Sequence, residues 1–440
     1  RAPQYHNGDQ DLSARAAFGW NEHFLLIDLE VDDDHFVQPY TGLKTWNGDS
    51  IQCGFAKAVE LPPGVNELEY LMTQAYSEID YALTTAGKEA YRTISFDRKN
   101  LPEGASRVDF RDPKIWKEKD GNFYCVIGSR PADGSGQILL YRSKNGFEWE
   151  FVSTLAENKN RYGKMWECPD FFELDGKYVL LTSPQDMIPE GMEYHNGNGT
   201  LCIIGDLDSE THTLKEQSYQ SVDYGIDCYA MQTLLAPDGR RIMIAWMQNW
   251  DTCANNRIPK GKWFGQMSLP RELSIKDGRL IQKPIWEIEN LRTNKTEYKN
   301  VAFEDVIRLD GVDGRCVDME ITLRPADAQN IYKKFAVRFA QNDTYHTAVS
   351  FRPYESVLKI DRKFSGSRRA IIHQRRSLVN SENGEIKLRL ILDRFSAEIF
   401  VNDGEHVMTA TIYTDLEADG ISFFADGKVE MDVTKYELKF

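Results

Sequence analysis

The sequence of 440 residues lacks paired cysteines, an excess of basic charge and long apolar runs. Its seven cysteines are scattered singly without a C-x-x-C pair, so neither a zinc site nor a disulfide framework is indicated. The net charge of −15 argues against nucleic acid and anionic membrane surfaces as partners, because both reward basic patches. No apolar run approaches the length of a membrane span.

The length of the chain bounds its organisation. A chain of 440 residues has material for two or three domains with buried cores. It begins at Arg1 without a methionine, which leaves a removed signal peptide open. Cytoplasmic and secreted locations therefore both stay open for what we expect to be a soluble protein.

Short segments of alternating polarity, separated by Asp-Gly turns, predict an all-β fold. The turns are Asp120-Gly121, Asp175-Gly176 and Asp238-Gly239. Asp-Gly between two strand-like runs recurs once in roughly 60 residues, which is the spacing of propeller blades. We therefore expect about three blades in residues 98–286. Residues 287–440 predict a separate β-sandwich, with strand-like runs such as 385–392.

Glu167, in residues 166–170 (WECPD), is the first candidate for a working acid. It follows a tryptophan that could shield it and precedes a proline that fixes the backbone. A carboxyl group beside an aromatic ring is easier to hold protonated, because loss of water disfavours its charged form. The alternative is a solvated glutamate at the start of a strand.

Asp112 is a second acid in a matching setting, since it also lies between a bulky segment and a proline. Arg111 beside it could keep the aspartate ionised by charge pairing. Two carboxyl groups in different environments are what glycoside cleavage needs. Taken alone, Arg-Asp-Pro is more often a turn with a local ion pair.

The two motifs, in this order and about 55 residues apart, resemble glycoside hydrolase family 32, the β-fructofuranosidases that include invertases, levanases and inulinases. The likeness covers residues from about 99 to 440. It is carried further by residues 223–233, 241–247, 265–273 and 392–405.

The resemblance implies a retaining mechanism on a β-fructofuranoside such as sucrose, its phosphate, inulin or levan. Glu167 would protonate the leaving oxygen and then act as base on water. Asp112 would bind fructose hydroxyls and stabilise the transition state, with Arg111 helping to position it. No metal and no organic cofactor is implied. The substrate-binding residues expected beside the two acids are Arg111, Trp166, Cys168, Asp227 and Tyr229; for the last two, packing in a central strand is an open alternative.

The family's propeller has five blades, and its nucleophilic aspartate lies in a Trp-x-Asn-Asp-Pro-Asn-Gly motif on the first blade. The sequence contains no such motif. Residues 46–50 (WNGDS) are the nearest likeness, but they lack the Asn-Asp-Pro-Asn order, so the nucleophile is not carried over to Asp49. The nucleophile stays unknown.

Residues 1–97 instead resemble family 9 carbohydrate-binding modules and related β-sandwiches. In residues 25–32, apolar and acidic side chains alternate, which predicts a strand with one buried face. Trp20 and Trp46 could stack on sugar or lie in a core. Residues 32–34 (DDD) could help to hold calcium, although a solvated turn is the simpler interpretation.

The expected fold class is therefore all-β: a partial or rearranged five-bladed β-propeller followed by a C-terminal β-sandwich, with an N-terminal β-sandwich-like module. Three blades alone would leave open sheet edges. Residues 1–97 could cover the open side, a partner chain or oligomer could complete the ring, or the sequence could be a gene fragment or rearranged product.

Two other functions stay open at this point. One is a catalytically silent protein that only binds fructan or another glycan, since the covalent step lacks its acceptor. The other is a structural fragment that needs a partner.

Overall fold

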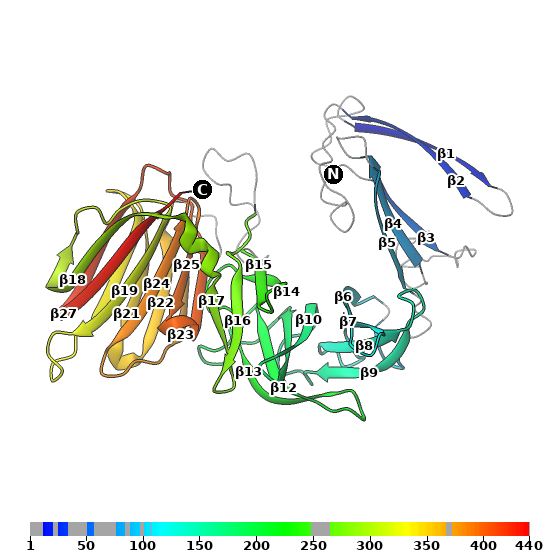
Figure 1. Cartoon of the computed structure of the whole chain (residues 1–440), viewed down its shortest axis with the longest axis horizontal. Coiled ribbons are helices and arrows are strands. Elements are labelled where there is room, and N and C mark those ends of the chain that lie inside the picture. The colour runs from blue at the N-terminus through cyan, green and yellow to red at the C-terminus, as the bar shows by residue number, and fades with distance from the viewer. Residues whose placement is uncertain are drawn as a thin grey trace. The chain divides into compact units, whose positions relative to one another are not determined.

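The computed structural model describes residues 12–20, 25–33, 51–56, 76–83, 89–96, 101–106, 108–247, 265–366 and 372–439. All the long elements within these ranges are strands, so the all-β expectation is confirmed (Figure 1). The chain divides into two compact units, Arg1–Leu101 and Pro102–Phe440. Among the described residues, no helix is long and apolar enough to cross a membrane.

The first unit contains a hairpin and a small antiparallel sheet. In the hairpin, β1 (Leu12–Trp20) pairs with β2 (Leu25–Asp33). The strand expected from the alternation in residues 25–32 is therefore present. The sheet has the order β3-β4-β5, with bounds Ile51–Ala56, Tyr76–Leu83 and Glu89–Phe96.

Three four-stranded antiparallel sheets follow one another in the second unit. The first consists of β6 (Phe110–Lys117), β7 (Phe123–Ser129), β8 (Gln137–Ser143) and β9 (Glu150–Glu157). The second consists of β10 (Trp166–Leu174), β11 (Lys177–Pro184), β12 (Leu201–Leu207) and β13 (Leu214–Gln220). The third consists of β14 (Tyr229–Leu235), β15 (Arg241–Trp246), β16 (Arg271–Lys276) and β17 (Arg279–Pro284). We call these sheets blades one to three.

The predicted Asp-Gly turns connect the first two strands of each of these blades. Gly121, Gly176 and Gly239 have φ angles of 87°, 76° and 91°, in the region where a side chain is disfavoured. Each glycine lies between the first two strands of its blade. The strands behind them bury apolar side chains, and Val126, Leu180 and Met243 have no exposed surface. Turn chemistry and alternation thus account for the blades locally.

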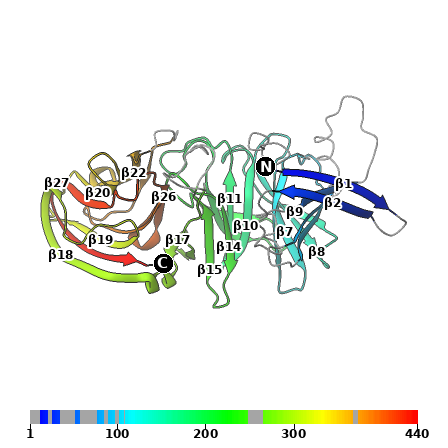
Figure 2. The ribbon, with the colours of Figure 1, turned by 90° about the horizontal axis from the view of Figure 1, so that it is seen from above.

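A ten-stranded arrangement forms the C-terminal part, after a short 3-10 helix, η5 (Trp286–Leu291). Its long strand β27 (Gly420–Leu438) pairs with β20 through its first half and with β19 through its second half. The two halves of β27 thereby belong to two layers, visible in Figures 1 and 2, whose apolar side chains form one core. The other strands are β18 (Arg292–Ile307), β19 (Val317–Pro325), β20 (Lys334–Gln341), β21 (His346–Arg352), β22 (Val357–Phe364), β23 (Gln374–Leu378), β24 (Ile386–Asp393), β25 (Ser396–Val401) and β26 (His406–Thr411).

A buried ionic cluster joins blade three to these C-terminal strands. The guanidinium of Arg271, on β16, has no exposed surface and bonds Asp223, Glu398 and Thr409. Burial raises the pKa of Glu398, and the charge of Arg271 opposes this rise. Because a buried charge is tolerated only when it is paired, the cluster fixes how blade three sits against the C-terminal layers.

Candidate active site

The innermost strands of the three blades share one irregularity. The pairing register shifts after Arg111 in β6, after Glu167 in β10 and after Tyr229 in β14. The next residue in each strand has left-handed backbone geometry: Asp112 with φ of 61°, Cys168 with 50° and Ala230 with 53°. Such β-bulges redirect a side chain and end regular pairing. At the corresponding position of its first strand, each blade therefore directs a polar or reactive segment toward the neighbouring blade.

Arg111, Glu167 and Tyr229 form a hydrogen-bonded chain across the three blades. Arg111 Nε donates to Glu167 Oε1 over 2.9 Å, and the Tyr229 hydroxyl donates to Glu167 Oε2 over 2.8 Å. The side chain of Glu167 is 9% exposed, whereas that of Arg111 is 33% exposed. The Glu167 carboxylate is thus more buried than the guanidinium, and each of its oxygens accepts one hydrogen bond.

The guanidinium of Arg111 pairs with Glu167, and the expected charge pair with Asp112 is not formed among the described residues. Its Nη1 also bonds Asp109 over 2.9 Å. The left-handed turn at Asp112 explains the difference, because it directs the Asp112 carboxylate to Cys168 instead. Burial lowers the pKa of Arg111, but the hydrogen bonds to Asp109 and Glu167 outweigh it and raise the pKa overall.

Asp112 caps the bulge of the next blade. Its Oδ2 accepts the backbone N–H of Cys168 over 3.1 Å and the thiol of Cys168 over 3.6 Å. Burial, and then the negative charge of Asp112, raise the pKa of the Cys168 thiol well above its ordinary value. The thiol is therefore a neutral hydrogen-bond donor rather than a thiolate nucleophile.

Tyr229 is likewise held in its neutral form. Burial raises the pKa of its hydroxyl, and the charge of Glu167 raises it further. The hydroxyl also lies 3.0 Å from the Ser183 carbonyl oxygen. Ala230, the bulged residue that follows, donates its backbone N–H to the Ser183 hydroxyl over 2.9 Å. These contacts tie β14 to blade two beside the carboxylate.

A second layer of polar contacts lies three positions further along the same strands, and its role was not predicted from the sequence. Lys114 Nζ lies 3.2 Å from Asp170 Oδ2 and 3.1 Å from Gln232 Oε1. Gln232 also donates to the backbone oxygen of Cys168. The repeated spacing, 111 and 114, 167 and 170, 229 and 232, is the signal that could have revealed it.

Two residues expected in the pocket wall lie elsewhere. Trp166 has no exposed surface; it packs in the apolar core between blades one and two, and its indole N–H donates to the Tyr162 carbonyl. Strand alternation points it away from the side that carries Glu167. Asp227 is also wholly buried and bonds Arg362 and Thr411 of the C-terminal strands. Neither side chain is placed to touch a substrate held by Glu167.

The expectations for the N-terminal module fall largely outside the described residues. Trp46, Asp49 and Asp34 belong to segments that the structure does not describe. Trp20 ends β1 and Asp32 lies in β2, and only their backbone is described. In the parts of the chain that are described, no group of three or more His, Cys, Asp or Glu side chains could hold a metal ion.

The geometry brings together two carboxyl groups, a guanidinium, a phenol and a thiol from three blades. Glu167 is buried enough to exchange a proton with a bound molecule away from bulk water, and Asp112 lies one strand away beside Cys168. Proton transfer and hydroxyl binding by paired carboxyl groups are the chemistry of sugar cleavage.

Two family models match the chain. The model for the "Glycosyl hydrolases family 32 N-terminal domain" matches residues 73–284, and that for "Glycosyl hydrolases family 32 C terminal" matches residues 287–439. The first match begins at residue 73, within the N-terminal module that was expected to span residues 1–97.

Relatives of known name are similar over most of the chain. A sucrose-6-phosphate hydrolase of Staphylococcus xylosus is 35% identical over 341 residues, which are 77% of this chain and 68% of that protein. A raffinose invertase of Escherichia coli is 33% identical over 328 residues, 74% of this chain and 65% of that protein. The chain thus spans about two thirds of the length of these relatives.

Solved structures agree with these matches. The β-fructofuranosidase of Bombyx mori, in a mutant form in complex with sucrose, aligns with a TM-score of 0.64 and 31% identity over 83% of this chain and 73% of that one. A sucrose-6-phosphate hydrolase from Lactobacillus gasseri aligns with a TM-score of 0.67 and 26% identity over 83% of this chain and 72% of that one.

Proposed function

Because the chain belongs to glycosyl hydrolase family 32, and is a glycoside hydrolase of the β-fructofuranosidase type, we propose that it cleaves the fructosyl bond of sucrose, sucrose phosphate or fructans with Glu167 as its proton donor. One observation carries this assignment. Glu167 is the carboxyl group at which contacts from all three blades meet, with Arg111 on one oxygen and Tyr229 on the other.

In this proposal Glu167 protonates the oxygen of the leaving group and later removes a proton from water, as a retaining mechanism requires. Arg111 and Tyr229 hold its two oxygens, which fixes the direction of the proton. Asp112 accepts hydrogen bonds from fructose hydroxyls and stabilises positive charge as the bond breaks. The carboxylate that attacks the sugar is not among these residues and stays unassigned.

The experiment is hydrolysis of sucrose and of inulin by the wild type and by Glu167→Gln. Glu173→Gln is a matched control, since Glu173 lies on the same strand but is exposed. We expect hydrolysis by the wild type and by the control, and a fall of at least 1,000-fold, about 4 kcal/mol, in Glu167→Gln. Undiminished activity in Glu167→Gln would remove its assigned role. Fructan binding without any hydrolysis by the wild type would favour a silent binding protein.

A further inference from the structure

Four charged side chains of alternating sign form a continuous row from the edge of blade one to Glu167. Arg130 Nη1 donates to Asp109 Oδ2 over 3.0 Å. The other oxygen of Asp109 accepts from Arg111 Nη1 over 2.9 Å, and Arg111 Nε donates to Glu167. The Arg111 guanidinium is therefore held between two carboxylates, of which only Glu167 has a role in the proposed reaction. We call Arg130, Asp109, Arg111 and Glu167 the ionic row.

The backbone of blade one brings Asp109 and Arg130 together. Phe110 pairs with Ser129 in the register of β6 and β7, so Asp109 and Arg130 lie opposite one another just beyond these paired residues. The backbone N–H of Asp109 donates to Ser106 Oγ over 2.9 Å. The backbone N–H of Ser106 in turn donates to the Arg130 carbonyl oxygen over 2.7 Å. Because both residues are anchored through the backbone, Asp109 can orient Arg111 at little further cost in conformational entropy.

Arg111 by itself favours the charged form of Glu167. Within the described part of the chain it is the only cation that forms an ion pair with Glu167, and a nearby opposite charge stabilises a carboxylate. A proton donor must instead carry its proton when the substrate binds. Burial lowers the pKa of Arg111, and its hydrogen bond to Asp109 is the larger of the two that raise it again. The charge of Arg111 is thus shared between Asp109 and Glu167.

The other ionisable groups around Glu167 do not contact Arg111. Burial raises the pKa of Tyr229 and of Cys168, so both are neutral. Asp112 is bonded to Cys168, and Lys114 pairs with Asp170 in the next layer of contacts. Among the described residues, Asp109 is therefore the only carboxylate besides Glu167 that bonds Arg111.

We propose that Asp109 is a positioning residue for the proton donor, an inference that rests on the proposed function. Asp109 holds the Arg111 guanidinium against Glu167 Oε1 and offsets its charge, so that Glu167 keeps its proton up to a higher pH. Arg130 holds Asp109 in turn. At a separation of roughly 7 Å and an effective dielectric constant of about 40 to 80, the repulsion between the Asp109 and Glu167 carboxylates corresponds to about 0.5 to 1 pH unit.

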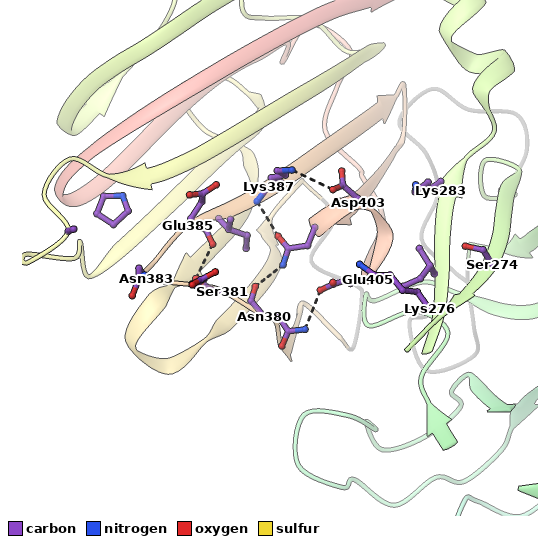
Figure 3. Close-up of a pocket in the computed structure, with 16 residues that line it drawn as sticks. Ser274, Lys276, Lys283, Asn380, Ser381, Asn383, Glu385, Lys387, Asp403 and Glu405 are labelled. Carbon is purple, nitrogen blue, oxygen red and sulfur yellow. Dashed lines mark hydrogen bonds and ion pairs between the residues drawn. The ribbon is translucent and has the colours of Figure 1, made fainter. Parts of the chain in front are cut away.

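The test is the pH dependence of kcat/KM for sucrose, whose basic limb reports the loss of the donated proton. Asp109→Asn keeps an oxygen that can accept from Arg111 and removes the charge, whereas Arg130→Gln removes the positive charge at the far end of the row. Asp403→Asn is the matched control. Asp403 pairs with Lys387 over 3.5 Å beside a groove between blade three and the C-terminal strands, and none of the residues that line this groove belongs to the ionic row (Figure 3). Circular dichroism checks that each variant is folded.

We expect Asp109→Asn to move the basic limb to lower pH by about 0.5 to 1 unit, with KM within twofold of the wild type. Arg130→Gln should move the limb to higher pH, by less, and Asp403→Asn should leave it in place. Asp109→Glu, which restores the charge, should return the limb toward its position in the wild type. A merely structural role of Asp109 would lower activity at every pH without moving the limb. An unmoved limb in Asp109→Asn, a move to higher pH, or an equal move in the control overturns the proposal.

Infrared difference titration of each protein against its Glu167→Gln counterpart follows the ionisation of Glu167 without turnover. We expect Asp109→Asn to shift this ionisation to lower pH, as it shifts the basic limb. If the wild type hydrolyses no fructoside and the infrared shift is present, the proposed function fails and the role of Asp109 stands. If the wild type hydrolyses sucrose and neither the limb nor the infrared signal moves in Asp109→Asn, the role of Asp109 fails and the proposed function stands.

Discussion

Replacing Asp227 by asparagine should destabilise the protein and leave its active pocket intact. Asp227 has no exposed surface, and its carboxylate bonds the Arg362 guanidinium and the backbone N–H and hydroxyl of Thr411. Removing one partner of a buried ion pair costs about 3–5 kcal/mol, because the other charge is left uncompensated. Arg362 would still donate to the Thr411 hydroxyl over 2.7 Å and to the Ile372 carbonyl over 3.2 Å. We therefore expect a loss at the lower end, about 3 kcal/mol.

Urea unfolding followed by fluorescence measures this loss, and sucrose kinetics on folded protein should show kcat/KM within twofold of the wild type. Asp206→Asn is the control, since Asp206 pairs with Lys177 at the surface with a side chain 50% exposed, and its removal should leave the unfolding midpoint nearly unchanged. Combining Asp227→Asn with Arg362→Met should recover part of the loss. An unchanged unfolding midpoint together with a KM raised tenfold would show that Asp227 binds substrate after all.

Tyr229→Phe removes the donor to Glu167 Oε2. It should lower kcat/KM for sucrose about 10- to 100-fold, because a charge-assisted hydrogen bond is lost. An unchanged value would mean that the hydroxyl does not orient the carboxylate. Gly128→Ala would place a Cβ 2.2 Å from the Trp166 carbonyl oxygen, so both activity and melting temperature should fall. If neither falls, the close packing of Gly128 against Trp166 is contradicted. Burial lowers the pKa of His406 to about 4, against 6.5 when it is unfolded. The unfolded state then binds more protons between these values, so stability should fall by up to about 3 kcal/mol as the pH drops from 6.5 to 4. His406→Gln should flatten that slope in unfolding measured across this range, and an unchanged slope would assign it to other groups.

The parts of the fold that depend on neighbouring residues were predictable from the sequence. The turns at Gly121, Gly176 and Gly239 and the alternating strands around them are local features, and the structure has them where they were expected. Glu167 was predicted from its local setting and Tyr229 from a family resemblance, and the structure brings the two side chains together.

Contacts between distant parts of the chain were not predictable in the same way. Nothing near Asp227 in the sequence reveals that it faces Arg362, 135 positions away. The expected pairing of Arg111 with Asp112 failed because adjacent residues in a bulged strand point in different directions. Side-chain direction at such a bulge depends on the next blade, which a linear pattern does not contain.

The bulges beside the pocket also bear on how the enzyme can adapt to heat. Cys168 and Ala230 hold left-handed backbone geometry, which costs an L-residue roughly 1–2 kcal/mol. That is a sizeable fraction of the free energy of unfolding of a typical protein, about 5–15 kcal/mol. Glycine at either position would relieve the cost, but it would also loosen the backbone next to Glu167 and Tyr229. Adaptation to higher temperature through these two positions would therefore act directly on turnover.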